Sequence, residues 1–187
     1  MTRILAIFLL VCSVTFIDTT TSYAGPKKIY LVNGLLSKLL GYGLTNLSKK
    51  IPSARHFKFA GGVTRATIDG IIADATRAYK ADPSTRISLV GISQGGKAIA
   101  TIAAALHKNG VRVHYMAVIE ASTTTKIYPN VRKVDNFICT GASCSRNPVR
   151  LVAGNSVTRV KVYNLDTGHV DSGNHPTMHR RVIAQVN

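Results

Sequence analysis

The sequence predicts an α/β fold: a three-layer αβα sandwich on a mostly parallel sheet of about six strands. Two observations support this. Short apolar segments alternate with helix-like segments from residue 28 to residue 186. Turn residues such as Asn33-Gly34 and Asn109-Gly110 separate them. Strands separated by helices favour parallel pairing, with helices on both faces of the sheet.

The first half of this alternation contains two strands and two helices. We predict a strand at 28–32, a helix at 45–51, a strand at 56–60 and a helix at 64–79. Pro52 ends the first helix. The second helix is indicated by an apolar stripe at helical spacing, formed by Ile68, Ile71, Ile72, Ala75 and Tyr79.

The second half supplies four more strands. They are predicted at 87–90, 111–119, 131–138 and 157–165. An Ala-rich helix at 97–107 has a thin surface that suits close packing on a sheet. A closing helix is predicted at 175–186, where Pro176 is tolerated in the first turn. We see no internal repeat or linker, so residues 25–187 are expected to form a single domain.

Residues 1–24 resemble a signal peptide. Met1-Thr2-Arg3 is a short basic segment, and 4–17 is mostly apolar. Ser22-Tyr23-Ala24 places small residues where cleavage before Gly25 requires them. The apolar stretch of about 14 residues is shorter than the roughly 20 that span a bilayer. We therefore expect export, periplasmic or secreted, with an uncleaved membrane anchor as the alternative.

The chain is strongly basic, with 24 Lys and Arg against 8 Asp and Glu and a net charge of +16. Such a charge predicts attraction to anionic membrane or envelope surfaces. The basic residues are scattered, and no segment resembles a nucleic-acid recognition element. We therefore expect no specific binding of nucleic acid. The sequence does not determine the oligomeric state.

Cys139 and Cys144 are the two cysteines outside the leader. Export makes disulfides possible, and the small residues between the two allow a local bridge. A loop this short removes little chain entropy, so the disulfide is expected to shape a turn.

The most informative motif is Gly91-Ile92-Ser93-Gln94-Gly95, which lies between a predicted strand and a predicted helix. In this context Gly-x-Ser-x-Gly is typical of a nucleophile elbow, in which a sharp turn projects the serine hydroxyl above the sheet. The glycines are needed because the strand and helix backbones approach closely. The alternative is that Ser93 simply caps the helix.

The chain resembles a small, lidless α/β-hydrolase of the lipase, esterase or thioesterase kind. The resemblance extends from Ile29 to the C-terminus and is carried by Asn33-Gly34, the Ser93 motif, Glu120 and Gly168-His169. The sequence departs from the superfamily at Asn33, where histidine is common, and in having glutamate where aspartate is more usual. The second departure leaves the acid open among Glu120, Asp135 and Asp166.

The resemblance implies a Ser-His-acid triad, in which Ser93 attacks, His169 moves the proton and Glu120 orients the imidazole. His175 is the second candidate for the base. Gln94 and Leu35 are expected to supply the oxyanion-hole N–H groups. A metal held by His169, Asp171, His175 and His179 is a weaker alternative, because their spacing matches no specific zinc pattern.

We therefore expect an exported serine hydrolase that cleaves a carboxylic ester or thioester without a cofactor, and a lipid-like molecule is one candidate substrate. The ten residues 121–130 are too few for a helical lid, which suggests an open site. The alternatives are a non-catalytic binding protein on the same fold and a serine acyltransferase. The sequence does not separate hydrolysis from transfer.

Overall fold

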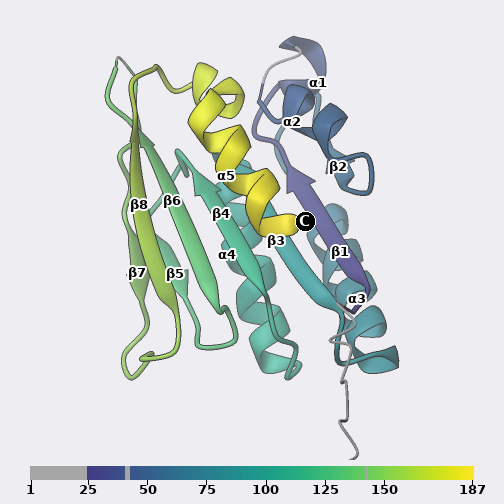
Figure 1. Ribbon diagram of the computed structural model, residues 1–187. Coiled ribbons are helices and arrows are strands. Elements are labelled where there is room, and N and C mark those ends of the chain that lie inside the picture. Colours follow the sequence, from purple (N-terminus) through teal and green to yellow (C-terminus); the bar gives the residue numbers. More distant parts are fainter. Residues whose placement is uncertain (1–24, 41–42, 142) are drawn as a thin grey trace, which may run out of the picture.

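The structure, a computed structural model, describes residues 25–40, 43–141 and 143–187 (Figure 1). The predicted signal peptide at 1–24 lies outside the described residues and stays a prediction. Within the described ranges, no helix combines the length and the apolar character needed to cross a membrane.

The main sheet has six strands in the order β2-β1-β3-β4-β6-β8, and every neighbouring pair is parallel. These strands are β1 (Lys27–Val32), β2 (Arg55–Phe57), β3 (Arg86–Ile92), β4 (Tyr115–Ile119), β6 (Lys133–Cys139) and β8 (Arg159–Leu165). The predicted fold class and number of strands are confirmed. Because all six strands run the same way, their carboxyl ends lie at one edge of the sheet.

Helices cover both faces of the sheet. They are α1 (Ser37–Leu40), α2 (Thr45–Lys50), α3 (Arg65–Ala81), α4 (Gln94–Lys108), the 3-10 helix η1 (Asp171–Asn174) and α5 (Pro176–Val186). In Figure 1, α5 crosses in front of the sheet, and α3 and α4 lie behind it. Each face has its own apolar core: Ile99 and Ile102 of α4 belong to one, and Met178 and Val182 of α5 belong to the other.

The connections on either side of β6 contain no helix, and the sequence analysis predicted none there, but each contains a short strand that was not predicted. β5 (Thr125–Ile127) joins β4 to β6, and β7 (Val149–Leu151) joins β6 to β8. These two short strands pair in parallel as a separate two-stranded sheet. β4 also begins at Tyr115, later than the predicted residue 111, although Val113 still forms an isolated bridge with Val131.

Candidate active site

Ser93 occupies a strained turn between β3 and α4. Its backbone has φ +56° and ψ −121°, a combination that costs about 1–3 kcal/mol for a residue other than glycine. The elbow is tight on both sides. A Cβ on Gly91 would overlap the Gly95 carbonyl group, and a Cβ on Gly95 would overlap the Val32 carbonyl oxygen. The two motif glycines are therefore required by the lack of space.

The Ser93 hydroxyl does not cap α4. Ser93 occupies the N-cap position, but its side chain accepts no hydrogen bond from the helix. Within the described residues, the half-buried hydroxyl makes no hydrogen bond at all. Ser93 therefore combines a strained backbone with a hydroxyl that bonds to no described neighbour. A nucleophile elbow has this combination, whereas the hydroxyl of a helix cap is bonded to the helix.

The loop after β1 lies against this serine. A Cβ on Gly34 would come within 2.9 Å of the Ser93 Cβ and 3.3 Å of its Oγ, so the backbone leading into Leu35 passes beside the hydroxyl. Asn33 holds the loop in place: its Oδ1 accepts the Leu44 N–H at 2.7 Å. Its Nδ2 lies 3.1 Å from His56 Nε2. Asn33 therefore has a structural role at the position where the resemblance led us to expect histidine.

Gln94, the other predicted oxyanion-hole residue, opens α4 directly after Ser93. The first N–H groups of a helix have no partner within the helix, and they carry its positive partial charge. The Gln94 N–H therefore belongs to a helix end that favours negative charge close to the serine.

Glu120 lies directly after β4, beside the elbow. The Ser93 N–H donates to Ile119 O at 3.0 Å, and the Ser122 N–H donates to Ser93 O at 3.1 Å. The backbone on either side of Glu120 is thus bonded to the serine. Glu120 itself has φ +43°, and its side chain is 0% exposed. It is not an ordinary exposed carboxylate at the end of a strand.

The buried Glu120 carboxylate is fully engaged. Oε1 accepts the Cys139 N–H at 2.8 Å, and Oε2 accepts the Ser145 N–H at 2.6 Å. His169 Nδ1 lies 3.3 Å from Oε2. The structure therefore brings together the predicted acid and the predicted base. The Nδ1 contact leaves the opposite ring nitrogen of His169, Nε2, for a second partner.

His169 follows β8, in a turn that hydrogen bonds hold on both sides. The Gly141 N–H donates to Thr167 O at 3.0 Å, and the Ser172 N–H donates to Gly168 O at 3.1 Å. The His169 side chain is 23% exposed. The imidazole is therefore fixed through its backbone and through Glu120, and solvent still reaches it.

Ser145 was not predicted as a site residue. Besides its N–H bond to Glu120, its Oγ lies 3.3 Å from His169 Nδ1, so it contacts both members of the pair. No local motif marks it in the sequence. Its position next to Cys144 was the one available signal.

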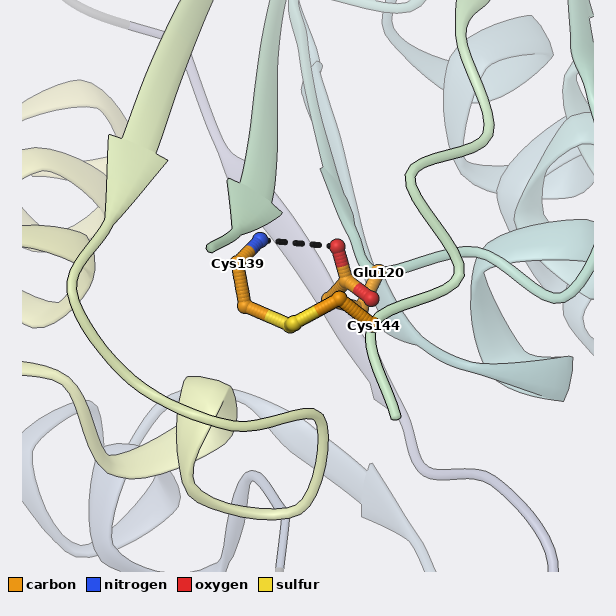
Figure 2. A group of neighbouring side chains, drawn as sticks. All are labelled: Glu120, Cys139 and Cys144. Atoms are coloured by element: carbon orange, nitrogen blue, oxygen red, sulfur yellow. Dashed lines mark hydrogen bonds between the residues drawn. A yellow bond between two sulfur atoms is a disulfide. The ribbon is translucent and has the colours of Figure 1, made fainter. Parts of the chain in front are cut away.

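The predicted disulfide is confirmed between Cys139 and Cys144. Figure 2 shows it beside the Glu120 carboxylate, with the Cys139 N–H bonded to that carboxylate. Ligand atoms of these three residues lie within 4.8 Å of one another, a spacing that could hold a metal. The two sulfurs are bonded to each other, however, and a disulfide does not supply the thiolates that bind metals.

The other candidate acids lie elsewhere. Asp135 lies inside β6, where its carboxylate accepts from Tyr115 Oη at 3.0 Å and from Arg181 Nε at 2.8 Å. Asp166 is exposed after β8. In the described part of the chain, Glu120 supplies the carboxylate that pairs with His169.

The other candidate histidines have structural partners. His175 caps α5, where its Nδ1 accepts the Thr177 N–H at 3.2 Å. His179 is buried, with Nε2 2.8 Å from Gly173 O and Nδ1 3.2 Å from Lys50 Nζ. Among the described residues, His169, Asp171, His175 and His179 do not converge on a common point as metal ligands would.

No protein-family model matches the sequence, and no curated protein matches it either. Solved structures do match. A protein from Pectobacterium atrosepticum, provisionally named a YdeN-like hydrolase, is 11% identical with a TM-score of 0.51, covering 86% of this chain and 91% of its own.

Two thioesterase domains match similarly. The domain that cyclises the lipopeptide antibiotic surfactin is 12% identical with a TM-score of 0.54, covering 87% of this chain and 92% of its own. The NocB domain of the nocardicin cluster is 12% identical with a TM-score of 0.50, covering 87% and 94%. At this identity the likeness concerns the fold, and it confirms the α/β-hydrolase-like architecture.

Proposed function

We propose that this protein is a serine hydrolase that cleaves a carboxylic ester or thioester. The observation that carries the proposal is that the buried Glu120, whose neighbouring backbone is bonded to the strained Ser93 turn, pairs with the partly exposed His169, with 3.3 Å between Glu120 Oε2 and His169 Nδ1. A nucleophile, a base and an orienting acid at one sheet edge are the parts that acyl transfer through serine needs. The hydrolases and thioesterase domains with the same fold support the reaction class.

Glu120 would orient the imidazole. Accepting the Nδ1 proton of His169 fixes the tautomer in which Nε2 is a base. Nε2 would then take the proton from Ser93 as Oγ attacks the substrate carbonyl, and would return it to the departing alcohol or thiol. A water molecule would cleave the acyl-enzyme by the same steps. The hydrogen bond between a catalytic serine and its histidine often forms fully only when substrate binds.

The N–H groups of Gln94 and Leu35 would stabilise the oxyanion. The Gln94 N–H lies at the start of α4, directly after Ser93. The Leu35 N–H follows Gly34, which packs against the Ser93 side chain. Donors of this kind typically contribute about 3 kcal/mol each to stabilising the transition state.

Hydrolysis is favoured over transfer to another acceptor, because transfer requires that water be kept from the acyl-enzyme. The His169 side chain is 23% exposed, and the connection after Glu120 contains only the three-residue strand β5. Water can therefore approach the base that would activate it.

A fluorophosphonate probe, followed by p-nitrophenyl esters of increasing acyl length, tests this proposal. We expect the wild type to be labelled and Ser93→Ala to be unlabelled. His169→Ala should react with the probe at least about 100-fold more slowly than the wild type, and it should hydrolyse the esters at least about 100-fold more slowly. Ser53→Ala and His107→Gln, two exposed positions away from the site, serve as matched controls that keep full labelling. An unlabelled wild type, or labelling that survives Ser93→Ala, would refute the proposal and favour a non-catalytic binding protein.

A further inference from the structure

A cavity of about 510 Å³ lies at the opposite edge of the sheet from Ser93. Its lining includes Arg86, which begins β3, Arg159, which begins β8, and Arg132, which directly precedes β6. Arg112 and His114 line it just before β4. Strand starts lie at the lower end of the sheet in Figure 1, so the candidate triad and this cavity are separated by the length of the strands.

The charge of the lining is entirely of one sign. Four arginines face this cavity, and none of its lining residues is Asp or Glu. None of the four forms an ion pair within the described residues. Elsewhere in the molecule carboxylates gather cations: Asp74 alone pairs with Lys28, Arg55 and Arg77. At this cavity, by contrast, no carboxylate of the lining offsets the four arginines.

The guanidinium groups retain donors for a ligand. Arg112 Nε donates to Tyr79 Oη at 2.5 Å, and one Arg86 nitrogen lies 2.8 Å from His114 Nε2. These bonds use part of the five N–H donors that each arginine carries. Arg132 and Arg159 are exposed, and their side chains have no partner among the described residues.

His114 adds no positive charge of its own to this lining. Burial lowers the pKa of His114 to about 4, helped by the neighbouring Arg86, Lys133 and Arg132. The histidine therefore stays neutral at physiological pH, where it can accept a hydrogen bond from Arg86. A bound anion would favour the charged form of His114 and so raise this pKa.

We propose that this cavity is a binding site for a phosphate-type anion carrying several negative charges. Guanidinium groups bind phosphate oxygens in bidentate fashion, and four of them balance more charge than a single carboxylate carries. Apolar surface from Pro83, Pro129 and Val157 also lines the cavity and suits the organic part of a phosphate ester or a lipid headgroup. The proposal is independent of the chemistry assigned to Ser93.

Titration calorimetry with inorganic pyrophosphate at physiological ionic strength tests this site. We expect binding by the wild type and at least about tenfold weaker binding by the Arg132→Gln/Arg159→Gln double variant. Arg150→Gln/Arg180→Gln removes the same charge from exposed positions outside the cavity and should bind within about twofold of the wild type. Saturating pyrophosphate should also raise the pKa of His114, followed through its ring protons by NMR.

Three outcomes would overturn the proposal. They are no binding of pyrophosphate, equal weakening in the two double variants, or equally tight binding of citrate, which carries carboxylates. Vesicles of phosphatidylcholine with and without phosphatidic acid then identify the source of the phosphate. Release of vesicle-bound protein by pyrophosphate would identify a lipid headgroup, whereas binding of pyrophosphate without binding of either vesicle would identify a soluble phosphate.

Discussion

Burying an ionised carboxylate costs several kcal/mol unless hydrogen bonds and charges compensate for the lost water. Glu120 has such compensation from two backbone N–H groups and from His169. Its backbone also has a positive φ, which is uncommon for residues other than glycine. A carboxylate held in this way is suited to orienting an imidazole, because it has little freedom to rotate away.

Comparison of three acid variants tests the role of Glu120. Glu120→Gln should lower kcat/KM by about 100-fold or more, because the amide no longer fixes the His169 tautomer. Asp166→Asn, an exposed change, should stay within about twofold of the wild type. Asp135→Asn should lower the free energy of unfolding by about 1–3 kcal/mol, because Arg181 loses its partner, with turnover per folded molecule unchanged. Ester hydrolysis and urea unfolding measure both effects. Loss of activity in Asp166→Asn instead would reassign the acid.

Among the larger elements, the segment that follows β6 is clipped by the Cys139–Cys144 disulfide. It delivers two donors to Glu120, one from each end of the clip: the Cys139 N–H and the N–H of Ser145, the residue after Cys144. The Glu120 carboxylate needs both of these N–H donors. We therefore expect the disulfide to affect the geometry of the site more than the stability of the fold.

Removing the bridge should therefore affect activity strongly. For Cys139→Ser/Cys144→Ser, the free energy of unfolding should fall by at most about 2 kcal/mol, the chain-entropy value for so short a loop. Turnover should fall about tenfold, because the Ser145 N–H is no longer held against Glu120. Assays well below the unfolding temperature separate the two effects. Dithiothreitol should slow the wild type and leave the double variant unaffected, and unchanged turnover after reduction would contradict this role.

Local sequence patterns predicted the elements that pack through their own apolar stripes, such as α3 and the β3–α4 elbow. They did not predict β5 and β7, because a three-residue strand is defined by its pairing partner and not by its own periodicity. Glu120 and His169 were predicted from their positions at strand ends. Ser145 could not be, because its contacts come from residues 25 positions before it and 24 positions after it.

Across the whole molecule, acidic side chains are mostly engaged with internal partners. Asp74, Glu120 and Asp135 are all buried and bonded. The surface is therefore left with most of the net charge of +16. Burial also lowers the pKa of His56, His114 and His179, so these three histidines add little to this charge near neutral pH.

This arrangement predicts a loss of stability in mild acid. The pKa of His114 is about 4 in the folded chain and about 6.5 when unfolded, so the unfolded state binds more protons between these values. Stability is full above pH 6.5 and falls towards pH 4, with about 1–2 kcal/mol from His114 after discounting for solvent screening. Urea unfolding across this range should show a shallower decline for His114→Gln. His107→Gln should follow the wild type, and identical slopes for all three would refute the assignment.

The polarity of the strands also has a geometric consequence. β3 runs from Arg86 at the arginine-lined cavity to Ile92, directly before Ser93, a rise of about 20 Å. If the cavity binds a phosphate in a bilayer or envelope layer, β3 is oriented away from that layer, and Ser93 faces the surrounding fluid. Its substrates would then arrive from the surrounding fluid, and the layer would be the attachment site of the protein and not its substrate.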